Sequence, residues 1–207
     1  MAKILIVYTT SLGNTLKMAR AVADGARSVT EVDLKSTDEA TKDDVKACDA
    51  LILGSPIRHR TADARIKKFI EDTLEQLWLT DEVVGKVGGV FSVGGGYGDM
   101  GAGCPKGLAS HRELAQLGML GAMAACGMVL VTLPKTTPGF QVAGMHWGPN
   151  GRSADEVMKP VGVSEQMLEA GYHHGANIAR VAQELAGKKL MAMGNVVPPP
   201  EVLKMFE

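Results

Sequence analysis

Near its start the chain reads KILIVYTTSLGNTLKMARAVADGA, which is residues 3–26. Residues 3–8 form an apolar run that is typical of a strand buried on both faces. A short polar turn follows, and after it apolar side chains recur at the spacing of one helix face. Those side chains are Leu16, Ala19, Val22, Ala23 and Ala26. The segment therefore predicts a strand, a polar loop and a helix, the opening unit of a parallel α/β sheet.

The same alternation continues along most of the chain. Apolar or alternating runs predict further strands at residues 29–34, 50–54, 87–93 and 128–133. Helical spacing predicts helices at residues 66–77, 114–126 and 167–185. Strands that alternate with helices predict a doubly wound, five-stranded parallel sheet with helices on both faces. Between the second and third strands, residues 35–48 are polar and carry no clear pattern.

Composition excludes several classes of protein. The 207 residues include 22 Lys and Arg against 23 Asp and Glu, so no basic surplus favours nucleic-acid binding. Three scattered cysteines argue against a disulfide framework or a metal knuckle. Residues 114–133 are almost wholly apolar, but they change midway from helix-favouring to β-branched residues, which predicts a helix and a buried strand and no membrane span. The first residues do not form a signal peptide, so we expect a cytoplasmic protein.

Two segments depart from the alternation. Residues 134–163 are rich in Pro and Gly, and a loop of this length within one domain usually has a function. Residues 188–207 contain Pro198-Pro199-Pro200, which predicts an extended tail. We therefore expect one domain over residues 1–187, including the long loop, followed by a Pro-rich arm.

The loop after the first strand is the strongest candidate binding site. It contains Thr10, Ser11, Leu12, Gly13, Asn14 and Thr15. Hydroxyls and free N–H groups at a helix N-terminus can hold a phosphate dianion, and this loop lies at the carboxyl end of a central strand, where open α/β sheets bind ligands. Helix capping by Ser11 or Asn14 is the alternative, but capping needs only one such residue. No Walker motif occurs here.

Two more loops follow strands at the same edge of the predicted sheet. After the third strand come Pro56, Ile57, Arg58 and His59. The fourth strand leads into Val93, Gly94, Gly95, Gly96, Tyr97 and Gly98. Glycines allow a flat ring to approach backbone groups, although a flexible turn would also use them. The spacing of Gly96, Gly98 and Gly101 matches a dinucleotide fingerprint only formally, because the motif does not open a βαβ unit.

This ordered set of loops resembles the WrbA-type NAD(P)H:quinone oxidoreductases, which are flavodoxin-like FMN reductases. The resemblance covers most of residues 1–187 and rests on TSLGNT (10–15), GSPIR (54–58), LW (77–78) and GMV (127–129). It implies the strand order 2-1-3-4-5, an FMN phosphate held by residues 10–15, and a flavin ring lined by residues 56–59 and 93–98. It also implies NAD(P)H as co-substrate, a substrate contact at Trp78, and a homodimer or homotetramer.

The chain departs from the family pattern at several positions. Leu12 and Asn14 stand where the family often has Tyr and His, and Ala125-Cys126 replaces a His before the GMV stretch. His146, in the long loop, could supply a replacement contact to the substrate, although a merely exposed histidine is the simpler interpretation. The adjacent His173 and His174 do not share a helix face, so a metal site is not expected there.

Two functions are compatible with these residues. One is an enzyme that transfers two electrons from NAD(P)H to a quinone or similar aromatic acceptor, and the other is a flavodoxin-type carrier of single electrons. Flavodoxins as a family are acidic and shorter, whereas this chain is nearly neutral and carries Arg58, Arg60 and Arg65 near the second loop. A cation beside the flavin stabilises the negative charge of the reduced ring, which favours the reductase. No protein nucleophile is needed, because the flavin carries the hydride.

Overall fold

A computed structural model describes residues 1–95, 111–155, 157–192 and 198–206. Its central sheet has the order β2-β1-β3-β5-β6, and all of these neighbours pair in parallel. The strands are β1 (Lys3–Tyr8), β2 (Glu31–Ser36), β3 (Ala50–Arg58), β5 (Val87–Gly94) and β6 (Val129–Leu130). Two short strands, β4 (Thr61–Ala62) and β7 (Asn150–Arg152), pair with β3 and β5. The expected flavodoxin-like sheet with order 2-1-3-4-5 is confirmed.

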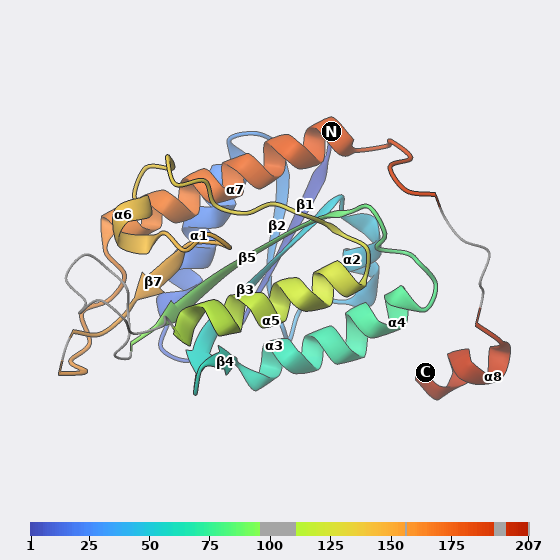
Figure 1. Cartoon of the computed structure of the whole chain (residues 1–207), viewed down its shortest axis with the longest axis horizontal. Helices are drawn as coiled ribbons and strands as arrows, with labels where there is room; N and C mark the ends of the chain where they lie inside the picture. The colour runs from blue at the N-terminus through green and yellow to red at the C-terminus, as the bar shows by residue number, and fades with distance from the viewer. Residues whose placement is uncertain (96–110, 156, 193–197, 207) are drawn as a thin grey trace.

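Helices cover both faces of the sheet, as Figure 1 shows. One face carries α1 (Asn14–Arg27) and α7 (Glu165–Leu185). The other carries α2 (Lys42–Ala47), α3 (Ala64–Phe69), the π-helical turn η1 (Ile70–Leu74), α4 (Glu75–Trp78) and α5 (His111–Ala125). The remaining helices are α6 (Phe140–Ala143), α8 (Pro200–Leu203) and the 3-10 turn η2 (Lys204–Phe206). None of the helices in the described ranges is both long and apolar enough to cross a membrane.

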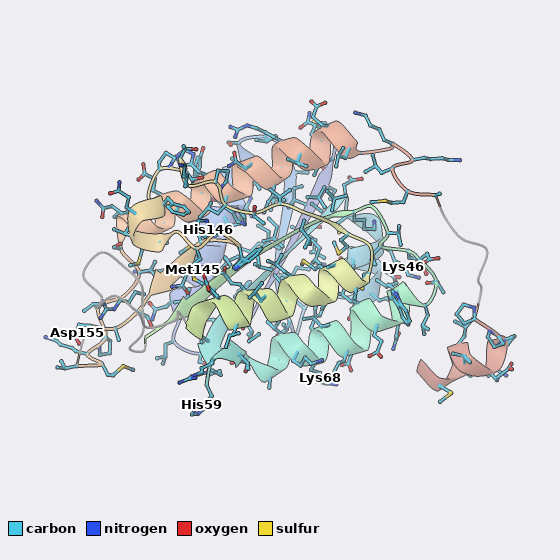
Figure 2. All side chains as sticks on the ribbon, in the orientation of Figure 1. Lys46, His59, Lys68, Met145, His146 and Asp155 are labelled. Carbon is cyan, nitrogen blue, oxygen red and sulfur yellow. The ribbon has the colours of Figure 1, made fainter. Side chains whose placement is uncertain are left out.

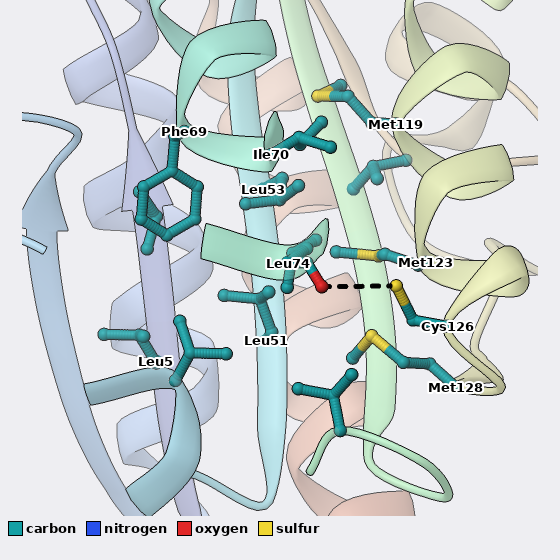
Figure 3. Close-up of a cluster of buried hydrophobic side chains, with 14 of the residues drawn as sticks. Leu5, Leu51, Leu53, Phe69, Ile70, Leu74, Met119, Met123, Cys126 and Met128 are labelled. Atoms are coloured by element: carbon teal, nitrogen blue, oxygen red, sulfur yellow. Dashed lines mark hydrogen bonds between the residues drawn. The ribbon is translucent and has the colours of Figure 1, made fainter. Parts of the chain in front are cut away.

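The alternation of side chains along the strands produces two hydrophobic cores. Ile4 and Ile6 of β1 face α1 and α7, whereas Leu5 and Val7 face the opposite layer. Figure 3 shows the core that contains Leu5, in which strand leucines meet methionines of α5. Because both faces of the central strands are covered, these strands are apolar throughout, which is why they are recognisable in the sequence.

Helices α1 and α7 approach each other unusually closely through glycines. A Cβ atom added to Gly175 would lie 1.9 Å from the carbonyl oxygen of Val22, and one added to Gly25 would lie 1.8 Å from that of Tyr172. Such contacts leave no room for any side chain at these two positions. The backbones of the two helices are therefore in direct contact at these glycines.

Three features differ from the sequence-based expectation. Residues 35–48 include the short helix α2, whose Thr41 and Asp44 form a reciprocal capping box. The fifth strand is split: β6 ends at Leu130, and β7 takes up the same edge of β5 after an insertion, residues 131–149. The tail is not extended throughout, because Pro200 begins α8, and proline is well suited to the first turn of a helix.

Candidate functional site

The loop between β1 and α1 presents an uncapped helix N-terminus. The residue before α1, Gly13, has a φ of 80°, and no side chain in the described part of the chain caps the helix. The Gly13 N–H instead donates to Thr10 Oγ1 at 3.1 Å, within the loop. No acidic side chain lies in the first turn of α1. The free N–H groups and positive helix dipole are therefore available to an anion, and capping by Ser11 or Asn14 is not observed.

Two arginines from the neighbouring loop reach this segment. Arg58 donates from Nη2 to Ser11 Oγ at 2.7 Å. Arg65 donates from Nη2 to the same oxygen at 3.0 Å and from Nη1 to the Thr10 carbonyl oxygen at 3.1 Å. The Arg58 guanidinium thus points toward the loop at residues 10–15, and its expected place beside a flavin ring stays a prediction.

Asp63 holds both arginines in place. Its carboxylate accepts from Arg65 Nε at 2.9 Å and from Arg58 Nε at 3.3 Å, and only 8% of its side chain is exposed. The hydrogen bond from the Arg65 side chain, helped by the bond from Arg58, lowers the pKa of Asp63 to about 2 despite its burial. Two guanidiniums therefore face one carboxylate beside Ser11.

A strained hairpin brings Arg58 to the loop. β3 and β4 pair antiparallel, with Ile57 opposite Ala62 and Arg58 opposite Thr61. The two turn residues, His59 and Arg60, have φ values of 43° and 74°, a conformation that asparagine and glycine adopt more readily. Both side chains are exposed at the tip of the hairpin, and Figure 2 shows His59 there. Non-glycine residues in this conformation occur often at functional sites.

The end of β5 lies beside the end of β3. Pro56 is paired with Val93, and a Cβ atom on Gly94 would lie 3.1 Å from Cδ1 of Ile57. A Cβ atom on Gly95 would lie 3.2 Å from the Cβ of Ala154, so the region after β7 closes the other side. The remaining residues expected in this loop, Gly96, Tyr97 and Gly98, lie outside the described residues.

One of the two expected substrate residues, Trp78, lies away from this edge, whereas His146 lies between α6 and β7. Trp78 is 50% exposed at the end of α4, near the start of β5 and thus at the opposite edge of the sheet from Ser11. His146 is exposed (Figure 2). The centroid of its ring lies 5.8 Å from that of Phe140. Among the described residues, neither side chain has a hydrogen bond to the loop after β1.

Sequence reasoning missed the role of Asp63. Its signal is local: an Asp directly before a helical pattern predicts a helix cap, and Asp63 does cap α3 by accepting from the Arg65 N–H at 3.1 Å. Its second role, the pairing with Arg58, depends on the hairpin and so carries no signal in the spacing of residues.

Comparisons with known proteins agree with this architecture. A family model described as a flavodoxin domain matches residues 5–89. A flavodoxin of Aquifex aeolicus is 48% identical over 100 residues, which are 47% of this chain and 53% of that protein. A protein of Archaeoglobus fulgidus named NAD(P)H dehydrogenase (quinone) is 31% identical over 211 residues, covering 89% of this chain and all of that protein. The chain belongs to the NAD(P)H dehydrogenase (quinone) family.

This family member is a flavodoxin-like oxidoreductase. Its fold is also that of a solved WrbA-like flavodoxin from Agrobacterium tumefaciens, with a TM-score of 0.65, 21% identity, and coverage of 89% of this chain and 99% of the other. The loop after β1 combines hydroxyls, an uncapped helix N-terminus and two arginines, with its one buried carboxylate already paired. This set of donors suits a phosphate monoester better than a neutral ligand.

Proposed function

We propose that the chain is an FMN-dependent oxidoreductase that transfers two electrons from NAD(P)H to a quinone or a similar aromatic acceptor. The observation that carries the proposal is the uncapped N-terminus of α1, with two arginines bound to Ser11 at the carboxyl edge of the sheet. The name and full-length coverage of the Archaeoglobus relative support the reaction class.

Each loop has a separate role in this proposal. Residues 10–15 would hold the phosphate of FMN through hydroxyls and backbone N–H groups. Residues 56–59 and 93–98 would line the ring, because Pro56 pairs with Val93 at the ends of two adjacent strands. When bound, FMN supplies hydride acceptance and donation at one ring nitrogen. The protein supplies binding, orientation and a positive charge. Trp78, at the opposite edge, is not among the residues proposed to meet the flavin within one chain.

Reconstitution tests the cofactor. We expect the purified protein to retain FMN after removal of free ligand, and to retain FAD poorly, because residues 10–15 form a compact loop suited to one terminal phosphate. The absorbance spectrum of the separated protein gives the stoichiometry. Preferential retention of FAD would contradict this assignment.

Steady-state turnover tests the reaction. The FMN-loaded protein should oxidise NADH or NADPH faster when benzoquinone is present than when it is absent. The alternative, a one-electron carrier, has some support from the identity to the Aquifex flavodoxin over about half of the chain. Stable FMN binding without any NAD(P)H-dependent reduction of benzoquinone would favour that carrier and overturn the enzyme.

A further inference from the structure

We propose that Arg65 is a positioning residue that makes the loop after β1 select a phosphorylated flavin over an unphosphorylated one. This inference rests on the proposed function and concerns the same site. It assigns the discrimination to a side chain on α3, outside the loop that would touch the phosphate.

The geometry holds the Arg65 guanidinium in a fixed orientation. Nε and Nη2 donate to the two carboxylate oxygens of Asp63 at 2.9 and 3.0 Å. Nη1 and Nη2 then reach the Thr10 carbonyl oxygen and Ser11 Oγ. Asp63 is itself fixed, because its N–H donates to Ser55 Oγ at 2.8 Å. A planar fork held on one side by a buried carboxylate presents its other side with little loss of freedom.

The hydrogen bonds to Ser11 determine what that hydroxyl can do. Ser11 Oγ accepts from both Arg58 and Arg65, and these two bonds use its acceptor capacity. Its single hydrogen is then left to donate to a ligand. Arg65 would thus act through Ser11 by orienting the hydroxyl as a donor, which favours an anionic phosphate oxygen.

The positive charges of the two arginines also favour an anionic ligand. Asp63 stays ionised at any ordinary pH because the Arg65 hydrogen bonds lower its pKa to about 2. One carboxylate offsets one of the two guanidiniums. The hydrogen bond to Asp63, and to a smaller degree the exposed Asp38, raise the pKa of Arg65. Both guanidiniums are hydrogen-bonded to Ser11 Oγ, so they place formal positive charge directly at the loop, which the backbone N–H groups of α1 alone do not supply.

The test compares FMN with riboflavin, which lacks the phosphate. Fluorescence titrations measure both dissociation constants for the wild type, for Arg65→Gln and for a control, Arg60→Asn. Arg60 lies in the same basic segment, and no hydrogen bond or ion pair joins it to any residue in the described part of the chain. Asparagine tolerates its left-handed backbone.

We expect Arg65→Gln to weaken FMN binding by roughly tenfold, as for the loss of one charge-assisted hydrogen bond, and to leave riboflavin binding unchanged. Arg60→Asn should change neither constant. Arg65→Lys should restore part of the FMN affinity, because it keeps the charge but not the fork. If Arg65 had only a structural role, Arg65→Gln would instead weaken the binding of FMN and riboflavin equally.

A double-mutant cycle tests the action through Ser11. If Arg65 orients that hydroxyl, Ser11→Ala and Arg65→Gln together should cost less FMN affinity than the sum of the single changes. An unchanged ratio of FMN to riboflavin affinity in Arg65→Gln, with FMN still bound tightly by the wild type, would overturn this inference alone. A wild type that binds neither flavin would overturn the proposed function and this inference with it.

Discussion

At the scale of single residues, the sequence predicts the chemistry of the loop at residues 10–15 better than it predicts the cations around it. Hydroxyls between a buried strand and a helix are visible in the sequence. Which of the basic side chains after β3 faces that loop depends on the left-handed turn at His59 and Arg60, which reverses the chain. Propensity favours other residues in such a turn, so the sequence carries no signal for it.

His174 is the buried residue whose protonation should govern acid stability. It lies on α7 with no exposed surface, and neither ring nitrogen has a hydrogen-bond partner among the described residues. Burial lowers its pKa from 6.5 to about 4, and the nearby Val90 carbonyl opposes this to a smaller degree. The folded state therefore keeps a neutral imidazole where the unfolded chain would already bind a proton.

The sign of the pH dependence follows from this difference. Stability from the neutral imidazole is fully present above pH 6.5 and is lost as the pH falls toward 4, by at most about 3 kcal/mol. His174→Leu should flatten that part of the profile of unfolding free energy, measured by urea denaturation at several pH values. His173→Leu, on the same helix but partly exposed, is the control. Parallel profiles for wild type and His174→Leu would contradict the assignment.

At the scale of elements, long apolar strands and amphipathic helices are predictable from periodicity, whereas short pieces defined by tertiary contacts are not. β6 is only two residues long, because the chain leaves β5 after Val131 and returns at β7. The helix α2 has one buried residue, Val45, so it carries almost no hydrophobic period. In both cases the decisive partners are far away in the sequence.

The contact between α1 and α7 gives a prediction about glycine. Gly175→Ala should destabilise the fold by about 1–3 kcal/mol, because the added Cβ would lie 1.9 Å from a backbone oxygen that cannot rotate away. Gly118→Ala, on α5, is the matched control with the opposite sign. Nothing lies within 4 Å of its added Cβ, so it should stabilise by about 0.5–1 kcal/mol through helix propensity. Chemical denaturation measures both, and equal changes would refute the packing argument.

One buried amide joins α5 to the segment that returns to the sheet at β7. Gln116 Nε2 on α5 donates to Ser92 Oγ at 2.9 Å and lies within hydrogen-bond distance of the carbonyls of Gly148 and Pro149. Gln116→Leu should cost about 1–3 kcal/mol of unfolding free energy, because each of these buried acceptors loses one donor. Gln141→Leu, at an exposed position of α6, should cost far less. A Gln116→Leu protein as stable as the wild type would show that the amide does not hold the insertion.

At the scale of the whole molecule, the sheet separates the candidate site from the C-terminal tail. The loops at residues 10–15 and 56–59 lie at the carboxyl edge, whereas the tail leaves α7 at the amino edge (Figure 1). There, Leu190 and Met191 line a cavity of about 460 Å³ with Gly85 and Lys86. A domain boundary at residue 187, expected from the sequence, would therefore remove apolar side chains that lie against the start of β5.

Two truncations test where the domain ends. A chain that stops at residue 192 should keep its unfolding free energy, because it retains Leu190 and Met191 beside Gly85, whose added Cβ would lie 3.8 Å from Met191. A chain that stops at residue 187 should lose about 1 kcal/mol, because both side chains are only partly buried. Both truncated proteins should bind FMN as the full chain does, since the tail and the loops lie at opposite edges of the sheet. Weaker FMN binding by the chain ending at 192 would instead connect the tail to the site, which no contact among the described residues predicts.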